Sequence, residues 1–302
     1  MAGFNFFQRF YYGKAGQADY TPDQLPDNRV QLFFEMLRIH FARLFTVNLI
    51  YLLFCLPALI WSGINFAVLQ AGDMQNPQGL LLSFYLPGMI PCLGLAGVGA
   101  VGEMRILRNW ARDQHVFLMS DYKDAIVGNW KQGLLVGLVN GFSLFIAAMC
   151  FFFYGQLAKE SALWLLPQML AMTITAVWWM MNMLLFPMMV TYDLKFKDLV
   201  RNAAIMAVAR LPWSVLFLAG SVGIPAMIAL FVPYGGIAMV VFYLAIGFAL
   251  TGFVYASYAN SCFDKFLNPR IEGAQVGMGL RGRTEDDWDD EPEGEDGPDT
   301  LV

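Results

Sequence analysis

Residues 120–140, SDYKDAIVGNWKQGLLVGLVN, join a charged amphipathic segment to an uncharged apolar run. Tyr122, Ile126 and Trp130 recur at every fourth residue, so in a helix they share one face. Polar residues occupy the opposite face, a pattern typical of a helix that lies in the membrane interface with its aromatic rings at headgroup depth. The stretch predicts a cytoplasmic interfacial helix over residues 121–132 that continues into a membrane span.

Glycines beyond this interfacial segment follow a regular spacing. Gly133, Gly137 and Gly141 form a GxxxGxxxG series, which lets two membrane helices approach closely. Gly94 and Gly97 belong to a second glycine-rich run, GLAGVGAVG. This run is not a dinucleotide-binding motif, because no predicted strand precedes it. We interpret all five glycines as helix-packing residues.

The composition indicates an all-α, polytopic helical membrane protein. Of the 302 residues, 58% are hydrophobic and only 14% are charged. Uncharged apolar runs of about 20 residues are long enough to cross a bilayer. We expect about six transmembrane helices, at residues 45–69, 80–101, 133–154, 163–190, 213–232 and 237–258. Pro87 and Pro91 interrupt the second run, so five or seven spans are the alternatives.

Two further basic amphipathic segments accompany the one at residues 121–132. They lie at about residues 29–44 and 195–210, and in both the apolar residues keep the helical period. Together the three segments predict three cytoplasmic interfacial helices, each followed by a pair of spans. This recurrence has two explanations, a weak internal triplication or the common physics of entering a membrane.

The distribution of charge predicts the topology. The net charge is −5, but residues 284–302 hold ten Asp and Glu and no Lys or Arg, which leaves 19 basic against 14 acidic residues elsewhere. Counted by connection from the N-terminus, Lys and Arg number 5, 0, 5, 1, 4, 0 and 4. The positive-inside rule places both termini and the two long loops in the cytoplasm.

The chain divides into three parts. Residues 1–44 form a cytoplasmic N-terminal segment with an amphipathic helix, and residues 45–260 form the six-span membrane domain. Residues 261–302 form a cytoplasmic tail. We expect this tail to be disordered from about residue 273, because like charges with few apolar partners do not fold alone.

Sequence motifs for enzymatic chemistry are absent. The chain has two histidines, His40 and His115, which are distant in sequence and are interpreted as polar surface residues rather than metal or acid–base groups. It contains no zinc-protease, serine-hydrolase or Walker motif. We therefore expect no enzymatic activity, no catalytic residue, no cofactor, no metal and no nucleic-acid partner.

The predicted spans carry no charged residue near their centres, which argues against a proton-coupled pump. Their polar residues are Asn48, Asn65, Asn140, Thr173, Thr175 and Asn182. The favoured role for these is hydrogen bonding between helices, worth about 0.6 kcal/mol each. The alternative is that they line a path for a solute.

Several segments share residues with a known family. They are Tyr12, Gly13, Lys14 and Gly16, then FFEMLRIHFARLFTVNLIYLLFCLPAL (33–59), Pro91, Gly94 and Gly97, RILRNWARDQH (105–115), SDYKDAIVGNWKQGLLVGL (120–138) and FPMMVTYDLKFKDLVRNA (186–203). In these segments the chain resembles the YesL-like bacterial membrane proteins, over most of its length up to residue 260. The acidic tail and residues 62–84 depart from the pattern.

The resemblance implies a small integral protein of the bacterial cell membrane, of a kind often encoded beside carbohydrate ABC transporters and glycan-degrading enzymes. It implies no catalytic residues, since the family has no assigned activity. Three function classes remain. The first is an accessory or regulatory component linked to carbohydrate uptake or utilisation. The second is a facilitative transporter or channel for a neutral solute such as a sugar, and the third, least favoured, is a membrane-embedded enzyme.

The interfacial segments and the loop after the second span carry candidate contact residues. We name as the basic surface the side chains of Arg38, Arg105, Arg108, Lys123, Lys197 and Arg201. One interpretation is that they anchor the protein to anionic lipid, at about 1 kcal/mol for each basic residue. The other is that they dock a membrane or cytoplasmic protein, such as an ABC transporter component.

Overall fold

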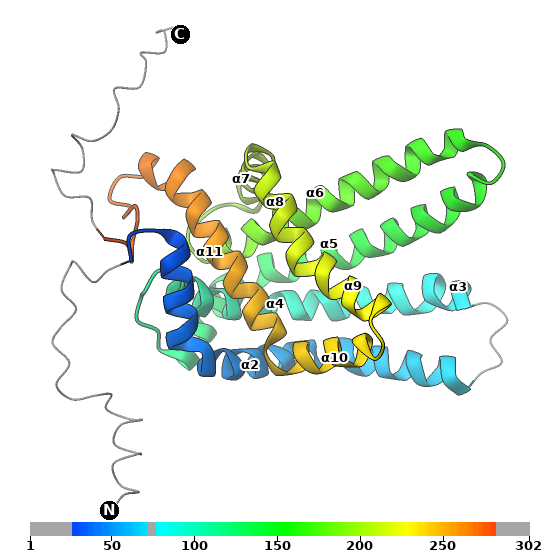
Figure 1. Ribbon diagram of the computed structural model, residues 1–302, viewed down its shortest axis with the longest axis horizontal. Helices are drawn as coiled ribbons and strands as arrows, with labels where there is room; N and C mark the ends of the chain where they lie inside the picture. Colours follow the sequence, from blue (N-terminus) through cyan, green and yellow to red (C-terminus); the bar gives the residue numbers. More distant parts are fainter. Residues whose placement is uncertain (1–25, 72–76, 282–302) are drawn as a thin grey trace, which may run out of the picture.

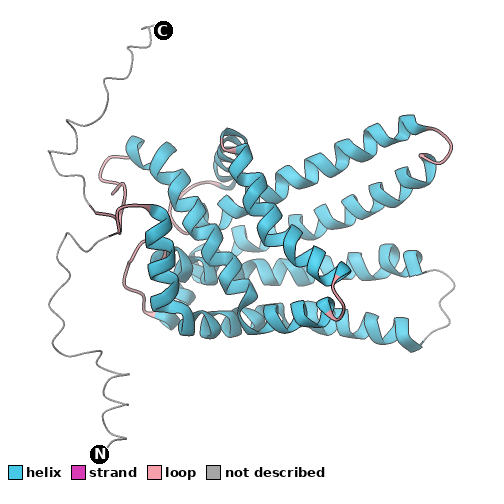
Figure 2. Ribbon diagram, viewed as in Figure 1, coloured by secondary structure: helices cyan, strands magenta, loops and turns pink. Residues whose placement is uncertain are grey.

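The computed structural model describes residues 26–71 and 77–281. Residues 1–25, 72–76 and 282–302, which include the acidic stretch, lie outside the described part, so the expectations for them stand as predictions. Every regular element of the described residues is a helix, and none is a strand (Figure 2). The all-α prediction is confirmed.

Among the described residues, six helices are long and apolar enough to cross a membrane. They are built from α2 (Arg29–Ala71), α3 (Pro77–Leu80) with α4 (Leu86–Trp110), α5 (Leu118–Leu157), α6 (Leu165–Met189), α8 (Leu211–Leu218) with α9 (Ile224–Phe231), and α10 (Gly235–Phe242) with α11 (Phe248–Phe266). Helix α7 (Phe196–Ala209) connects α6 to α8, and short 3₁₀ turns lie at Ala162–Trp164 and Asn268–Arg270.

The amphipathic segments join the spans in two ways. Segments 29–44 and 121–132 are continuous with the spans that follow them, inside α2 and α5, whereas the third forms the separate helix α7. Asn28 caps α2 by accepting hydrogen bonds from the N–H groups of Val30 and Gln31. The first turns of α2 cross the direction of its remainder (Figure 1), so this segment lies across the end of the bundle.

Three π-helical turns interrupt the spans, at Leu81–Tyr85, Ala219–Gly223 and Tyr243–Gly247. The first two precede Pro87 and Pro225. Because proline has no N–H, it leaves the carbonyl four residues earlier unpaired, and here that carbonyl falls inside the π turn. The second span therefore bends without breaking, and the count of candidate spans is six rather than five or seven.

The predicted packing glycines lie between α4 and α5. A Cβ atom on Gly97 would come within 2.3 Å of the Gly133 carbonyl oxygen, and one on Gly137 within 2.2 Å of the Leu93 carbonyl oxygen. A Cβ atom on Gly141 would lie 2.7 Å from the Ile90 Cα, and one on Gly94 would meet α5 side chains from 3.0 Å. The two backbones touch because these positions lack side chains.

Helix α4 extends beyond the expected end of the second span. The sequence interpretation ended that span at residue 101 and assigned Glu103 to a long loop, but α4 continues to Trp110 and the connection is only residues 111–117. The extension buries Glu103, Ile106 and Leu107 in the core. Tyr122 also departs from its predicted place at headgroup depth, since its side chain is buried and its hydroxyl donates to the Gly99 carbonyl oxygen at 2.9 Å.

One end of the bundle is closed by the segment that follows α11. Asp264 forms an ion pair with Arg29 and accepts hydrogen bonds from Asn268 Nδ2 (2.5 Å) and the Gly277 N–H (3.1 Å). Tyr192 donates to Asn268 Oδ1 at 2.5 Å, and burial raises the pKa of Tyr192 to about 12, so its hydroxyl remains a neutral donor near pH 7.

Residues 273–281 of the same segment make contacts with the rest of the fold. Residues 273–281 contain no helix or strand, yet Gln275 accepts from Arg112 Nη2 at 3.2 Å, and the Arg281 N–H donates to the Pro26 carbonyl oxygen at 3.0 Å. Leu280 packs against the core. The expected disorder from residue 273 stays a prediction, and these contacts show what residues 273–281 touch across the fold, which a count of charges does not register.

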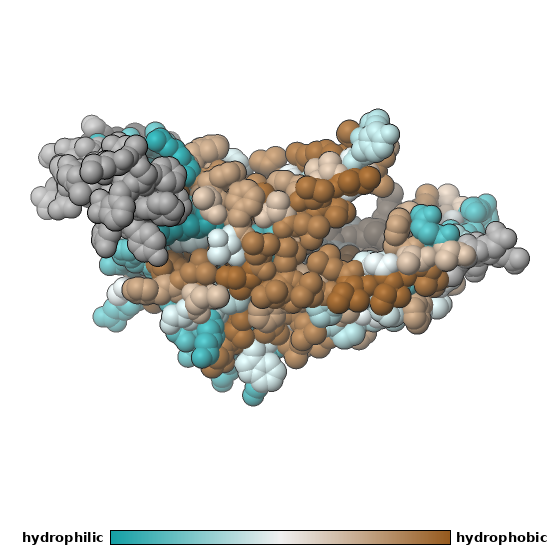
Figure 3. Space-filling view, turned by 90° about the horizontal axis from the view of Figure 1, so that it is seen from below, coloured by the Kyte–Doolittle hydropathy of each residue, from teal (hydrophilic) through white to brown (hydrophobic). Residues whose placement is uncertain are grey.

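The surface of the bundle matches a lipid environment. Leu53, Ile146, Ile174 and Leu230 are each more than half exposed, on four different spans. Figure 3 shows apolar residues across the middle of one face and hydrophilic residues toward its ends. A water-soluble protein rarely exposes so continuous an apolar surface, so the described residues form a multi-pass membrane protein.

Candidate functional site: a polar chamber inside the bundle

A half-open chamber of about 320 Å³ lies between the helices of the bundle, and all six candidate spans contribute to its wall. Each span contributes at least one polar residue, and these include Tyr51, Glu103, Asn140, Asn182, Ser221 and Tyr243. Trp179 and Phe248 add aromatic surface. Small-molecule sites combine apolar walls with a few converging polar groups in this way.

Glu103 is the one acidic side chain in the chamber wall. It is only 5% exposed, and its Oε1 has no hydrogen-bond partner among the described residues. The carboxyl group lies against Gly252 of α11, which has no side chain. A Cβ atom added at Gly252 would lie 3.9 Å from Glu103 Cδ. A buried carboxylate without a cationic partner is costly within a membrane domain, and such residues usually serve a function.

Asn182 on α6 supplies a second unpaired acceptor. Its Nδ2 donates to the Trp178 carbonyl oxygen at 3.0 Å, which fixes the orientation of the amide, and its buried Oδ1 has no partner. Neighbouring Asn140 accepts a hydrogen bond from Trp178 Nε1 at 2.8 Å. This bond joins α5 to α6 and holds the Asn140 amide at the chamber wall.

The opposite wall is built from π turns. Ser221 lies in the π turn of the fifth span, and its hydroxyl is 2.6 Å from the Tyr255 hydroxyl. Tyr243, in the π turn of the sixth span, donates to the Ser221 carbonyl oxygen at 3.2 Å. Such turns are frequent at functional sites, because they release backbone groups from the helix.

The chemistry of the chamber follows from these contacts. Asn182 Oδ1 is an acceptor, and the Glu103 carboxyl accepts a hydrogen bond or, when protonated, donates one, so a fitting ligand carries groups such as hydroxyl or amide that can do both. No Lys, Arg or His is among the lining residues, so an anionic ligand would find no charge partner there. The chamber can therefore hold a small polar solute without negative charge.

The other intramembrane polar residues have different roles. Asn48 bonds across helices to the backbone of the sixth span, as the favoured interpretation predicted. Asn65, Thr173 and Thr175 bond only to carbonyls of their own helices, so the interhelical role is wrong for them. Asn140 and Asn182 combine a structural hydrogen bond with a place at the chamber wall.

Only four of the six side chains of the basic surface are exposed in the structure. Arg38, Lys123, Lys197 and Arg201 are exposed. Arg105 is half-buried and donates to the Val190 carbonyl oxygen at 2.9 Å, whereas Arg108 is buried and donates to Asn109 Oδ1 and Gln114 Oε1. The assignment of Arg108 to an exposed docking face is wrong, because α4 carries it into the packed end of the bundle.

The histidines form no site together. The His40 ring stacks on the Trp110 ring with centroids 4.5 Å apart, and His115 is exposed on the loop after α4. Across residues 26–71 and 77–281, no group of three His, Cys, Asp or Glu side chains is placed to hold a metal ion.

The fold and the chamber define the class: a multi-pass helical membrane protein with a half-open chamber between its spans, in which a few polar groups lie among apolar walls. No family model, curated protein or solved structure matches the chain. The sequence interpretation missed Glu103 as a chamber residue, although one signal was available. Met104, Ile106 and Leu107 continue the apolar helical pattern past Glu103, which indicates that the helix extends beyond residue 101.

Proposed function

We propose that the protein binds a small polar solute without negative charge in this chamber and carries it across the membrane as a facilitative transporter. The supporting observation is that two buried acceptors without partners, Glu103 Oε1 and Asn182 Oδ1, line the same chamber. Unpaired buried acceptors are rare because each costs about 1–3 kcal/mol, and a donor-bearing ligand removes that cost.

The lining favours a polyol or a sugar. Hydroxyl groups can donate to both unpaired acceptors, and Trp179 and Tyr51 give flat apolar surfaces for the less polar faces of such a ligand. The YesL-like resemblance points to carbohydrate use, which agrees with this class of solute. A small ammonium compound is the alternative ligand, and the charge of Glu103 distinguishes the two.

For the orientation, we infer that the protein lies in a bacterial cell membrane with both termini in the cytoplasm. The connections at residues 111–117 and 190–195 lie at the end of the bundle where α2 begins and α11 ends (Figure 1). These connections belong to the basic-rich side of the chain, so the positive-inside rule assigns that end to the cytoplasm.

Transport by the purified full-length protein in liposomes tests the proposal. Counterflow is measured for a panel of labelled polyols and monosaccharides, with carboxylate and ammonium compounds of similar size beside them. Saturable flux of a neutral solute is the expected result. Asn182→Leu should reduce the apparent affinity about tenfold, because it removes one acceptor. Glu103→Gln should have a small effect on a neutral solute and a large effect on a cation.

Matched variants control for general damage. Asn129→Leu removes an amide bonded only within its own helix, and Glu160→Gln changes a carboxyl on the exposed turn after α5. Neither should alter flux. A folded protein that moves no neutral or cationic solute in the panel, and whose Tm none of them raises, would contradict the proposal.

A second candidate function is docking as an accessory component of carbohydrate uptake. Lys123, Lys197 and Arg201 are exposed and have no ion-pair partner in the described part of the chain, which leaves their charge free for a partner. Replacing all three with Glu should abolish co-purification of a partner from native membranes. Lys159→Glu, at the opposite end of the bundle, is the control. Equal recovery with the triple variant contradicts docking through these residues.

A further inference from the structure

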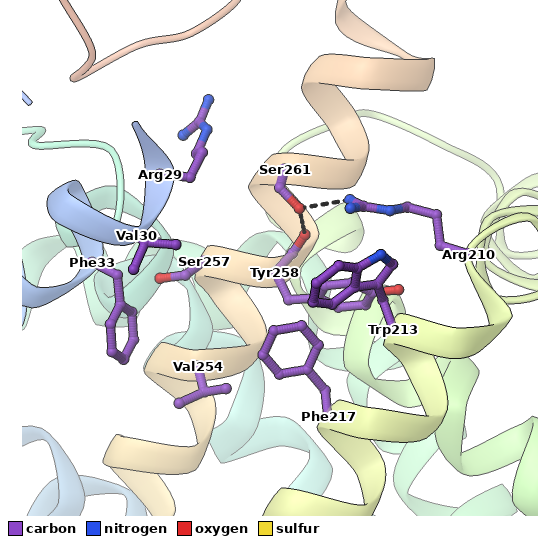
Figure 4. Close-up of a pocket in the computed structure, with 10 residues that line it drawn as sticks. All are labelled: Arg29, Val30, Phe33, Arg210, Trp213, Phe217, Val254, Ser257, Tyr258 and Ser261. Carbon is purple, nitrogen blue, oxygen red and sulfur yellow. Dashed lines mark hydrogen bonds between the residues drawn. The ribbon is translucent and has the colours of Figure 1, made fainter. Parts of the chain in front are cut away.

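A second pocket, separate from the chamber, opens between α2, α11 and the corner that joins α7 to α8. Its volume is about 510 Å³, larger than that of the chamber. Figure 4 shows its side chains in two groups, with Arg29, Ser261 and Arg210 above and Phe33, Val254 and Phe217 below; Val30, Ser257 and Trp213 lie between them. The pocket is thus polar on one side and apolar on the other.

The polar side carries an arginine that has no acidic partner. Arg210 Nη1 donates to Ser261 Oγ at 2.8 Å, and its guanidinium lies 5.6 Å from the centre of the Tyr258 ring. Within residues 26–71 and 77–281 no carboxylate forms an ion pair with Arg210. A guanidinium has five N–H donors, so this side chain retains donors for a ligand oxygen.

Two further groups complete the polar side. Arg29 is paired with Asp264, so the two arginines and this carboxylate leave one positive charge uncompensated at the mouth of the pocket. Ser257 Oγ is buried and has no hydrogen-bond partner among the described residues. The uncompensated guanidinium of Arg210, which keeps N–H donors, is suited to a phosphate oxygen.

The apolar side lies deeper in the membrane domain. The chain runs from Arg210 into α8 toward Phe217, and α11 runs from Val254 outward to Ser261, so both helices place the polar groups nearer the end of the bundle. Trp213, which is half exposed, lies at the border between the two groups. Tryptophan is enriched at this depth in membrane proteins.

We propose that this pocket binds one anionic phospholipid, with its phosphate at Arg210 and the upper part of an acyl chain along Phe33, Val254 and Phe217. A phosphodiester carries one negative charge, which matches the one uncompensated positive charge. A free phosphate ion would leave the apolar side uncovered. A zwitterionic lipid would add its own positive charge to a pocket that already holds two arginines.

Native mass spectrometry of the full-length protein tests this site. The protein is released from nanodiscs that contain equal amounts of phosphatidylglycerol and phosphatidylcholine with identical acyl chains. One retained phosphatidylglycerol per protein is expected, in clear excess over phosphatidylcholine. Arg210→Gln should lower its retention at least about tenfold, because a charge-assisted hydrogen bond is lost.

Two further variants separate this pocket from general surface attraction. Arg43→Gln removes an exposed positive charge from α2, a helix that also lines the pocket, and should leave retention unchanged. Val254→Trp fills the apolar side of the pocket without changing its charge, and, like Arg210→Gln, it should lower the retention of phosphatidylglycerol. Tm measurements verify that each variant is folded.

Three results would overturn the proposal. They are equal retention of the two lipids, an equal loss with Arg43→Gln and Arg210→Gln, and displacement of the lipid by millimolar inorganic phosphate, which would assign the site to free anions. Neither the proposal nor its test depends on solute transport, so the lipid site can fail while the chamber stands.

Discussion

Asn48 on α2 accepts the backbone N–H of Ala249 on α11 through its Oδ1, at 3.1 Å. Its Nδ2 donates to the carbonyl oxygens of Tyr243 and Leu244, at 3.1 and 3.0 Å. These backbone groups belong to the π turn of the sixth span and the first turn of α11. One buried amide therefore satisfies three backbone groups of a neighbouring span.

Replacing Asn48 with Leu should destabilise the fold, because the backbone groups of the π turn would be left unpaired in an apolar interior. The expected loss is about 1–3 kcal/mol in the free energy of unfolding. It is measured as a lower Tm in detergent. Asn129→Leu, at an amide that bonds only within α5, should leave the Tm nearly unchanged. Equal Tm values for the two variants would contradict the clamping role of Asn48.

Gly137→Ala should lower the Tm and the yield of folded protein, since its Cβ atom would lie 2.2 Å from the Leu93 carbonyl oxygen on α4. Gly128→Ala is the matched control in the same helix, because a Cβ atom there meets nothing within 4 Å. The control should be neutral or stabilising by up to about 1 kcal/mol, the difference in helix propensity between the two residues. A lower Tm for the control alone would rule out the glycine contact.

Cysteine labelling tests the orientation of the bundle. After the four native cysteines are replaced, a cysteine at Gly236 should react with a membrane-impermeant reagent added outside the cell. A cysteine at His115 should react only after the membrane is permeabilised. Both positions are exposed, so access to the thiol and not burial determines the result. The reverse pattern would invert the topology.

Truncation should separate the acidic tail from the segment that precedes it. A chain ending at Arg281 should insert and unfold like the full chain, because it keeps every contact described for residues 268–281. A chain ending at Glu272 loses the hydrogen bonds at Gln275 and Gly277 and the packing of Leu280, so its Tm should fall. Equal Tm values for the two truncations would show that residues 273–281 contribute nothing.

The amino-acid sequence by itself determined the class of fold. Runs of apolar residues long enough to cross a bilayer specify six helices, because backbone groups in lipid must pair within their own helix. The spacing of Gly133, Gly137 and Gly141 likewise specified the face that α5 turns toward a neighbour, because residues four apart share one side of a helix.

Only the tertiary structure decided which residues meet. Glu103 and Asn182 are 79 positions apart in the chain and lie on different spans, and no local pattern reports that both reach one chamber. Arg210 and Ser261 likewise come together only because the start of α8 packs near α11. Helical periodicity shows which face of a helix is apolar, whereas a chamber is formed by faces of several helices whose rotation and tilt depend on packing contacts throughout the bundle.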